Sequence, residues 1–274
     1  MSEAGRVPDG VDVTRPSPAR LYDYYLGGTN NFEVDRIAAD KLREIMPELS
    51  DMAWSNRGFH QRAAEFIAAQ GVRQFIDIGS GLPATGNTHE VVLKVAPDAR
   101  VVYVDHDPMV AAMAEGLIAD PESARLIEAD LREPDALLSH PVLTEMIDFS
   151  QPVGLLMTAV MHFVSDASKP RALVGRYVKA LAPGSYLALS QGTSDNLPPK
   201  MVQAAKEMYK RSTERLYPRP KAVIESFFEG LELVEPYPGA GPNLCFVGMW
   251  GAQDPQAADT DGSRIMYCGV ARRP

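Results

Sequence analysis

The stretch FIDIGSGLP (residues 75–83) decides the fold, because a short apolar run leads directly into a glycine-rich turn. The run has the length and the β-branched content of a buried strand. Gly79 and Gly81 permit a tight turn and let the backbone approach a ligand closely. Asp77 stands where a dinucleotide-binding turn normally has a neutral residue, and its carboxylate suits a cationic ligand. A tight turn with a capping aspartate is the alternative interpretation.

From residue 72 onward, further apolar runs alternate with helix-like stretches. The strand-like runs include RVVYVDHD, ARLIEAD, PVGLLMTAV and GSYLALSQ. This alternation predicts an α/β fold with a parallel sheet and right-handed crossovers. LELVEP and IMYCGVARRP are expected to pair at one edge, where the last strand runs antiparallel. We therefore predict one Rossmann-like domain over residues 72–274, in which residues 237–264 receive no assignment.

The first 71 residues have a different pattern. Residues 1–16 are polar and contain proline and glycine, which predicts a flexible N-terminus. Residues 17–71 carry helical periodicity and are predicted to form a helical segment that covers the sheet domain. In its second helix, Asn30 is expected to be the N-cap, with Glu33 as its capping-box partner.

Acidic residues end the second and third predicted strands. Asp105, followed by His106, can accept hydrogen bonds from the two hydroxyls of a ribose. Asp130, followed by Leu131, can accept from the exocyclic amine of an adenine. A solvated loop carboxylate and a helix cap are the respective alternatives. Because parallel strands end at one edge of the sheet, these acids and Asp77 are predicted to share that rim.

The fourth strand delivers an imidazole to the same rim. Thr158 and Ala159 end the apolar run and are followed by Met161-His162-Phe163. An imidazole titrates near neutral pH, so His162 is a candidate general base for a hydroxyl or an amine. A structural histidine that holds the loop is the alternative.

Composition excludes several classes of function. The 274 residues carry a net charge of −9, which opposes binding to the phosphates of a nucleic acid. We find neither a signal-peptide core nor an apolar run long enough for a membrane span, so a cytoplasmic protein is expected. Cys245 and Cys268 lie in apolar surroundings, which indicates buried thiols and no metal site.

Taken together, the glycine turn and the strand-end acids resemble a class I, Rossmann-like S-adenosylmethionine-dependent methyltransferase. The segment DYYLGGTNNF (residues 23–32), with DIGSGLP and AVMHFV, narrows this resemblance. It is similar to the actinobacterial S-adenosyl methyltransferase family that was formerly a domain of unknown function. The resemblance extends from Pro16 to Arg273. Pro83 departs from the general class, which often has a third glycine there.

The resemblance implies S-adenosyl-L-methionine as the cofactor. It implies that the cofactor is bound by the turn and the strand ends, namely Asp77, Gly79, Ser80, Gly81, Asp105, His106, Asp130, Leu131, Thr158 and Ala159. It also implies that the helical segment is a lid, with Tyr22, Tyr25, Asn30 and Phe32 near the methionine end or the substrate pocket. Arg57 is a candidate contact for a carboxylate. For the tyrosines, plain helix packing is an equal alternative.

The predicted reaction is in-line transfer of a methyl group from the sulfonium to a small molecule. An Asn-Pro-Pro-Tyr motif, associated with methylation of nucleic-acid amino groups, is absent after the fourth strand. Two alternatives stay open. One is a non-catalytic sensor or partner-dependent subunit that binds the cofactor but lacks an enclosed substrate pocket, and the other is an NAD-dependent oxidoreductase. The sequence predicts neither the acceptor nor the oligomeric state.

Overall fold

The structure is a computed structural model that describes residues 7–114, 118, 120–195 and 197–274. Eight strands form one sheet in the order β3-β2-β1-β4-β5-β8-β6, and β7 also pairs with β8. The bounds are β1 (Gln74–Ile78), β2 (Arg100–Asp105), β3 (Ala124–Glu128), β4 (Gly154–Thr158), β5 (Tyr186–Gly192), β6 (Glu232–Leu233), β7 (Cys245–Phe246) and β8 (Met266–Arg272). Strands β1 to β5 are parallel, and β8 is antiparallel to β5 and β6. The predicted α/β sheet with an antiparallel last strand is confirmed.

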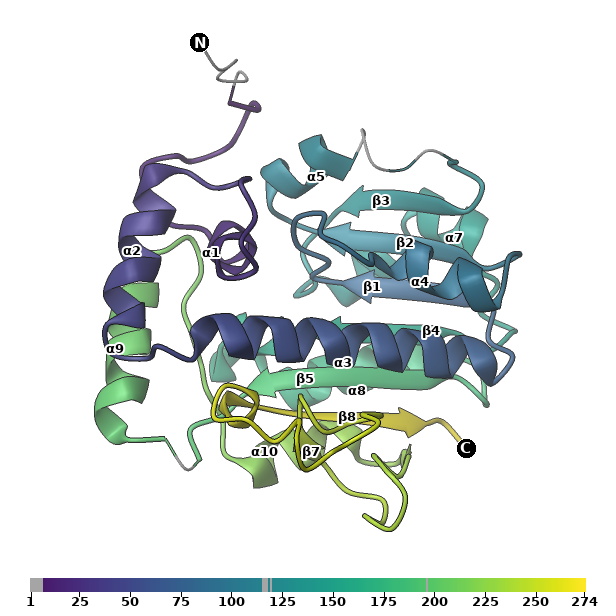
Figure 1. Ribbon diagram of the computed structural model, residues 1–274. Helices are drawn as coiled ribbons and strands as arrows, with labels where there is room; N and C mark the ends of the chain where they lie inside the picture. Colours follow the sequence, from purple (N-terminus) through teal and green to yellow (C-terminus); the bar gives the residue numbers. More distant parts are fainter. Residues whose placement is uncertain (1–6, 115–117, 119, 196) are drawn as a thin grey trace.

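Helices cover both faces of the sheet and the ends of its strands. Their bounds are α1 (Pro18–Tyr25), α2 (Glu33–Arg43), α3 (Leu49–Ala69), α4 (Thr88–Val95), α5 (Pro108–Ala114), α6 (Pro134–Leu138), α7 (Pro141–Met146), α8 (Pro170–Ala180), α9 (Pro199–Tyr209) and α10 (Lys221–Glu225). The long helix α3 runs alongside the strands and packs on β4 and β5, while α1, α2 and α9 gather beyond the arrowheads of the parallel strands (Figure 1). The strand ends therefore face a helical wall.

Alternation along β1 sends its side chains to two separate cores. Phe75 packs in the core that contains Ile67 of α3, whereas Ile76 and Ile78 pack in the core that contains Val174 of α8. Since successive side chains of a strand point to opposite faces, Asp77 lies on the α3 side. The face on which Asp77 lies determines which groups its carboxylate can contact.

Asp35 joins the first two helices. Its carboxylate accepts hydrogen bonds from the backbone N–H of Ser17 (3.0 Å), from Nε of Arg20 (2.8 Å) and from the backbone N–H of Phe32 (2.9 Å). Phe32 is therefore the N-cap of α2, and the prediction that Asn30 caps this helix with Glu33 is wrong. The carboxylate reaches back from the third helical position, which satisfies an N–H that the helix leaves free.

Arg62 of α3 anchors the connection that the sequence left unassigned. Its guanidinium donates to the carbonyls of Val247 (3.0 Å), Gly248 (3.1 Å) and Trp250 (2.6 Å). The ring of Trp250 also packs edge-on against Phe59 of α3, with 5.8 Å between the ring centroids. This part of the chain thus depends on α3 for its position.

The described part of the predicted flexible N-terminus contacts the connection between α9 and α10. The backbone N–H of Thr213 donates to the carbonyl of Pro16 (2.9 Å), and the side chain of Arg15 donates to the carbonyl of Ser212. Residues 1–6 lie outside the described residues. Throughout the described ranges, every helix is too short or too polar to cross a membrane.

Replacing Asp35 is expected to destabilise the protein strongly. The Asp35→Ala variant leaves the buried guanidinium of Arg20 without its carboxylate, so the free energy of unfolding should fall by about 3–5 kcal/mol. Asp135→Ala is the matched control, because that exposed carboxylate pairs with Arg176 at the surface and should cost less than about 1 kcal/mol. Urea unfolding measures both, and equal losses in the two variants would contradict this role of Asp35.

Candidate functional site

A cavity of about 320 Å³ lies at the carboxyl ends of the parallel strands, beneath α1 and α9. Its walls come from α1, the first twelve residues of α3, the loops after β1 to β5, α9 and the connection that follows it. The residues predicted to bind the cofactor that line it are Gly79, Ser80, Gly81, Asp105, His106, Asp130, Leu131, Thr158 and Ala159. The strand-end rim and the helical segment therefore enclose one space.

The glycine turn after β1 has a backbone that other residues would strain. Gly79 and Gly81 have φ values of +71° and +67°, in the left-handed region that favours glycine. A Cβ atom at Gly79 would also overlap the side chain of Val160. Beside them, Ser80 lines the cavity and its buried hydroxyl lacks a hydrogen-bond partner among the described residues. The turn thus offers a cradle of backbone and a free hydroxyl to a ligand.

Asp105 braces this turn and also lines the cavity. Its carboxylate accepts from the backbone N–H of Gly81 (2.9 Å) and from that of Asp107 (3.0 Å). Burial raises the pKa of the Asp105 carboxyl, although these hydrogen bonds oppose the shift. A ligand hydroxyl that donates to the same carboxylate would lower its pKa again.

Asp130 lines the cavity as predicted, but it is already engaged in an ion pair. Nε of Arg132 donates to both of its carboxylate oxygens (2.8 and 2.9 Å), and the same guanidinium reaches Glu214 (3.2 Å). Glu214 also accepts from Nε2 of His106 (3.0 Å). Burial raises the pKa of the Asp130 carboxyl, and the bonds from Arg132 reverse this shift and leave the pKa below its usual range. Asp130 is therefore ionised at the rim.

Asp77 lies behind the wall of the cavity and is absent from its lining. The hydroxyl of Thr88, at the start of α4, donates to the Asp77 carboxylate (2.5 Å), and Nε2 of His60 lies 3.7 Å from it. Burial raises the pKa of the Asp77 carboxyl to about 6. The sequence placed this carboxylate against the ligand, whereas the structure places His60 and Thr88 around it.

The predicted lid residues divide into two groups. Tyr22, Tyr25 and Arg57 line the cavity, whereas Asn30 and Phe32 do not. The hydroxyl of Tyr22 donates to the carbonyl of Ala53 (2.9 Å) and accepts from Nδ2 of Asn56 (2.9 Å), and burial raises its pKa to about 12. The guanidinium of Arg57 donates to Oδ1 of Asn87 (3.2 Å). Phe32 packs under the guanidinium of Arg20 instead.

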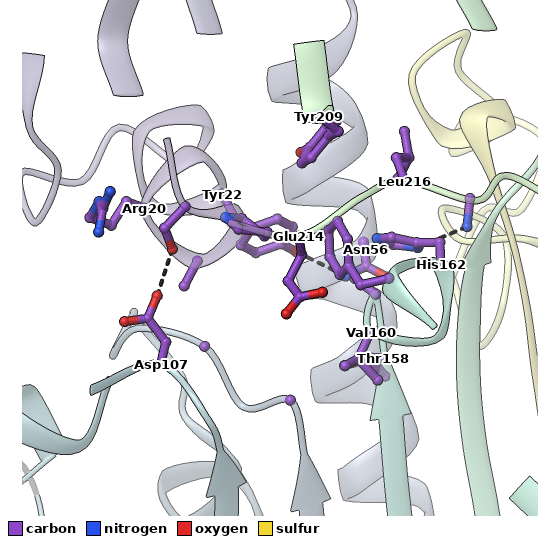
Figure 2. Close-up of a pocket in the computed structure, with 18 of the residues that line it drawn as sticks. Arg20, Tyr22, Asn56, Asp107, Thr158, Val160, His162, Tyr209, Glu214 and Leu216 are labelled. Atoms are coloured by element: carbon purple, nitrogen blue, oxygen red, sulfur yellow. Dashed lines mark hydrogen bonds between the residues drawn. The ribbon is translucent and has the colours of Figure 1, made fainter. Parts of the chain in front are cut away.

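His162 points from the end of β4 into the cavity and is buried (Figure 2). The backbone N–H of Gly192 donates to its Nδ1 (3.2 Å), so the neutral ring carries its proton on Nε2. Burial, together with the nearby guanidinium of Arg219, lowers the pKa of His162 to about 3. This geometry favours a hydrogen-bond donor over the general base that the sequence suggests.

The half of the cavity beyond His162 is apolar. In Figure 2, Tyr209 and Leu216 lie on the opposite side of the space from Val160 and Thr158. The other apolar residues that line it come mainly from α1, the α2–α3 junction and α9, and include Tyr25, Leu26, Leu42, Met46, Leu49, Met52, Leu197, Val202 and Ala205. Such a lining is typical of a pocket for a small organic molecule.

Several polar and aromatic residues of the site were not indicated by the sequence. His60 and Asn56 line the cavity from α3, and Tyr209 and Glu214 reach it from α9 and the following connection. His60 follows Arg57 by one helical turn in SNRGFHQR, which was the one available signal for it. No local pattern indicates Glu214.

Comparisons with known proteins agree with this geometry. The S-adenosyl methyltransferase family matches residues 4–274. A crystal structure of a candidate methyltransferase from Thermobifida fusca YX has 37% sequence identity, covers 97% of each chain and gives a TM-score of 0.88. That of a DUF574 family protein from Streptomyces avermitilis MA-4680 has 38% identity, covers 96% of this chain and 99% of that chain, and gives a TM-score of 0.88.

No curated protein matches the chain. The family match alone spans nearly every residue, and the two crystal structures share the fold from end to end. These findings argue against the alternative of an NAD-dependent oxidoreductase, because the matched family is one of S-adenosyl methyltransferases. The chain belongs to the S-adenosyl methyltransferase family and is an S-adenosylmethionine-dependent methyltransferase.

Proposed function

We propose that the protein transfers the methyl group of S-adenosylmethionine to a small, largely apolar molecule. This molecule binds in the apolar half of the cavity beyond His162, which we call the outer half; the half at the strand ends is the nucleoside half. The observation that carries this proposal is the continuity of the two halves. The rim that fits a nucleoside opens directly into an apolar chamber walled by α1, α9 and the α2–α3 junction. A cofactor sensor needs the first half only.

The nucleoside half would hold the cofactor through groups of three kinds. The carboxylate of Asp105 suits the ribose hydroxyls, and its neighbour Gly81 lets the backbone approach the ligand. The ionised carboxylate of Asp130 suits the adenine amine, although Arg132 competes for the same oxygens. Arg57 offers a buried cation for the carboxylate of the methionine part. When bound, the cofactor supplies an electrophilic methyl group on a sulfonium.

The outer half would align and desolvate the acceptor. Methyl transfer to a nucleophile is an in-line displacement, so holding the acceptor at the correct angle accounts for much of the rate. Apolar walls exclude water from the acceptor atom, so the acceptor meets the methyl group without its hydration shell. His162 would donate from Nε2 to a polar atom of the acceptor and fix its orientation.

The direct test of the proposed function combines binding and turnover. Calorimetry with S-adenosylmethionine and S-adenosylhomocysteine measures the nucleoside half, and release of S-adenosylhomocysteine with a panel of apolar hydroxy, amino and thiol compounds measures the outer half. We expect both ligands to bind and at least one class of acceptor to be methylated. Tight binding without turnover on any member of the panel would favour a cofactor sensor.

The Asp105→Ala variant is expected to weaken the affinity for S-adenosylhomocysteine by about 1–3 kcal/mol. The change removes the acceptor for the ribose hydroxyls and for the N–H of Gly81. Calorimetry measures the affinity, and thermal unfolding of the free protein shows whether the fold is retained. A folded variant with unchanged affinity would exclude Asp105 from the nucleoside site.

The Ala205→Phe variant is expected to block the acceptor and spare the cofactor. Ala205 is buried on α9 and lines the apolar half, so a phenyl ring there occupies space that the acceptor needs. Turnover should fall by at least about tenfold, whereas the affinity for S-adenosylhomocysteine should stay unchanged. Lys206→Phe, on the exposed face of the same helix, is the matched control and should keep its turnover. Equal turnover in both variants would place the acceptor elsewhere.

A further inference from the structure

Four buried side chains form one line of hydrogen bonds between Asp77 and the cavity. Thr88 Oγ1 donates to Asp77 Oδ2 (2.5 Å), His60 Nε2 lies 2.8 Å from Thr88 Oγ1, and His60 Nδ1 lies 2.9 Å from Thr158 Oγ1. The four side chains come from β1, α4, α3 and β4. Each residue is at least nine-tenths buried, and only His60 and Thr158 line the cavity.

While Asp77 is ionised, counting hydrogens fixes the direction of every bond in this line. Thr88 has one hydroxyl hydrogen and gives it to the carboxylate, so it can only accept from His60. The ring of His60 therefore carries its proton on Nε2, and its bare Nδ1 accepts from the hydroxyl of Thr158. Thr158 has then used its hydrogen and presents only lone pairs to the cavity.

We propose that His60 is a positioning residue that links Asp77 to Thr158 and makes the Thr158 hydroxyl an acceptor for the ammonium group of the cofactor. The inference rests on the cofactor of the proposed function and adds residues that the strand-end pattern did not contain. Hydrogen bonds in series polarise one another, so the carboxylate at one end strengthens the acceptor at the other. A carboxylate screened from the cavity thereby contributes to the recognition of a cation inside it.

The groups around this line keep the ring neutral. Burial, together with the guanidinium of Arg57 from the same helix, lowers the pKa of His60 to about 3. Asp77 is faced by Thr88 from α4, by Arg57 and His60 from α3, and by Asp105 and Tyr103 from β2. With the pKa of its carboxyl near 6, Asp77 is ionised at neutral pH and protonates as the pH falls through that value.

The test compares two ligands that differ in the amino-acid part. S-adenosylhomocysteine carries the ammonium group, whereas methylthioadenosine has the same nucleoside without it. Calorimetry gives the ratio of their affinities, which isolates recognition of the amino-acid part from that of the nucleoside. Thr158→Val and Thr88→Val remove one hydroxyl each at nearly constant shape, and Thr158→Ser and Thr88→Ser are matched controls that retain it.

Both valine variants should bind S-adenosylhomocysteine about tenfold to a hundredfold more weakly, while their affinity for methylthioadenosine stays unchanged. The serine variants should restore the wild-type ratio. In the wild type, the preference for S-adenosylhomocysteine should decrease as the pH falls through about 6, because a protonated Asp77 no longer polarises the line. The valine variants should lose this pH dependence. Nitrogen-15 NMR of the free wild type should report the Nε2–H tautomer of His60 between pH 7 and 8, where Asp77 is ionised.

Several results would overturn the proposal. One is a wild-type affinity ratio in the valine variants. Another is an affinity ratio in the wild type that does not change with pH, and a third is the opposite tautomer of His60. If a valine variant fails to fold, the wild-type pH profile and the NMR measurement still decide. A wild type that binds neither nucleoside would instead refute the proposed function, so the two failures are distinguishable.

Discussion

The contact between α3 and the sheet is the constraint on which the rest of the structure depends. The apolar face of α3 packs Ala63, Ala64 and Ile67 against the sheet in one continuous core. The middle of the same helix carries Asn56, Arg57 and His60 into the cavity. Because the helix is fixed along its length by this burial, these polar groups are held at defined distances from the strand ends. The helical segment thus belongs to the site as much as the sheet does.

The sheet and the rim could be predicted because they depend on local patterns. Apolar runs of strand length, separated by helical stretches, indicate a parallel sheet, and its carboxyl ends must share one edge. Asp105 and Asp130 follow from that argument, and both line the cavity. The pairing of β6 with β8 was likewise predictable, since LELVEP and IMYCGVARRP are the last two strand-like runs of the sequence.

The remaining contacts could not be predicted because they join residues far apart in the chain. His60 meets Thr158 across 98 positions, and helical periodicity alone does not say which strand its face will touch. Asp77 lies at the predicted strand end, but the side of the sheet that α3 covers is decided by tertiary packing. Asp130 turns toward Arg132, two residues further on, and a motif cannot exclude such a local ion pair. Asn30 is not the cap because α2 begins at Glu33, so Phe32 takes the N-cap position and its N–H donates to Asp35.

The link between Glu214 and the rim has a consequence for the wall of the cavity. Glu214 reaches His106 and Arg132 from the connection after α9, and the side chains of these two partners are 44% and 35% exposed. Attraction between partly solvated charges is weakened by dissolved ions over a distance of about 8–10 Å. The strength with which this connection is held to the strand ends therefore depends on the ionic strength of the solution as well as on the amino-acid sequence.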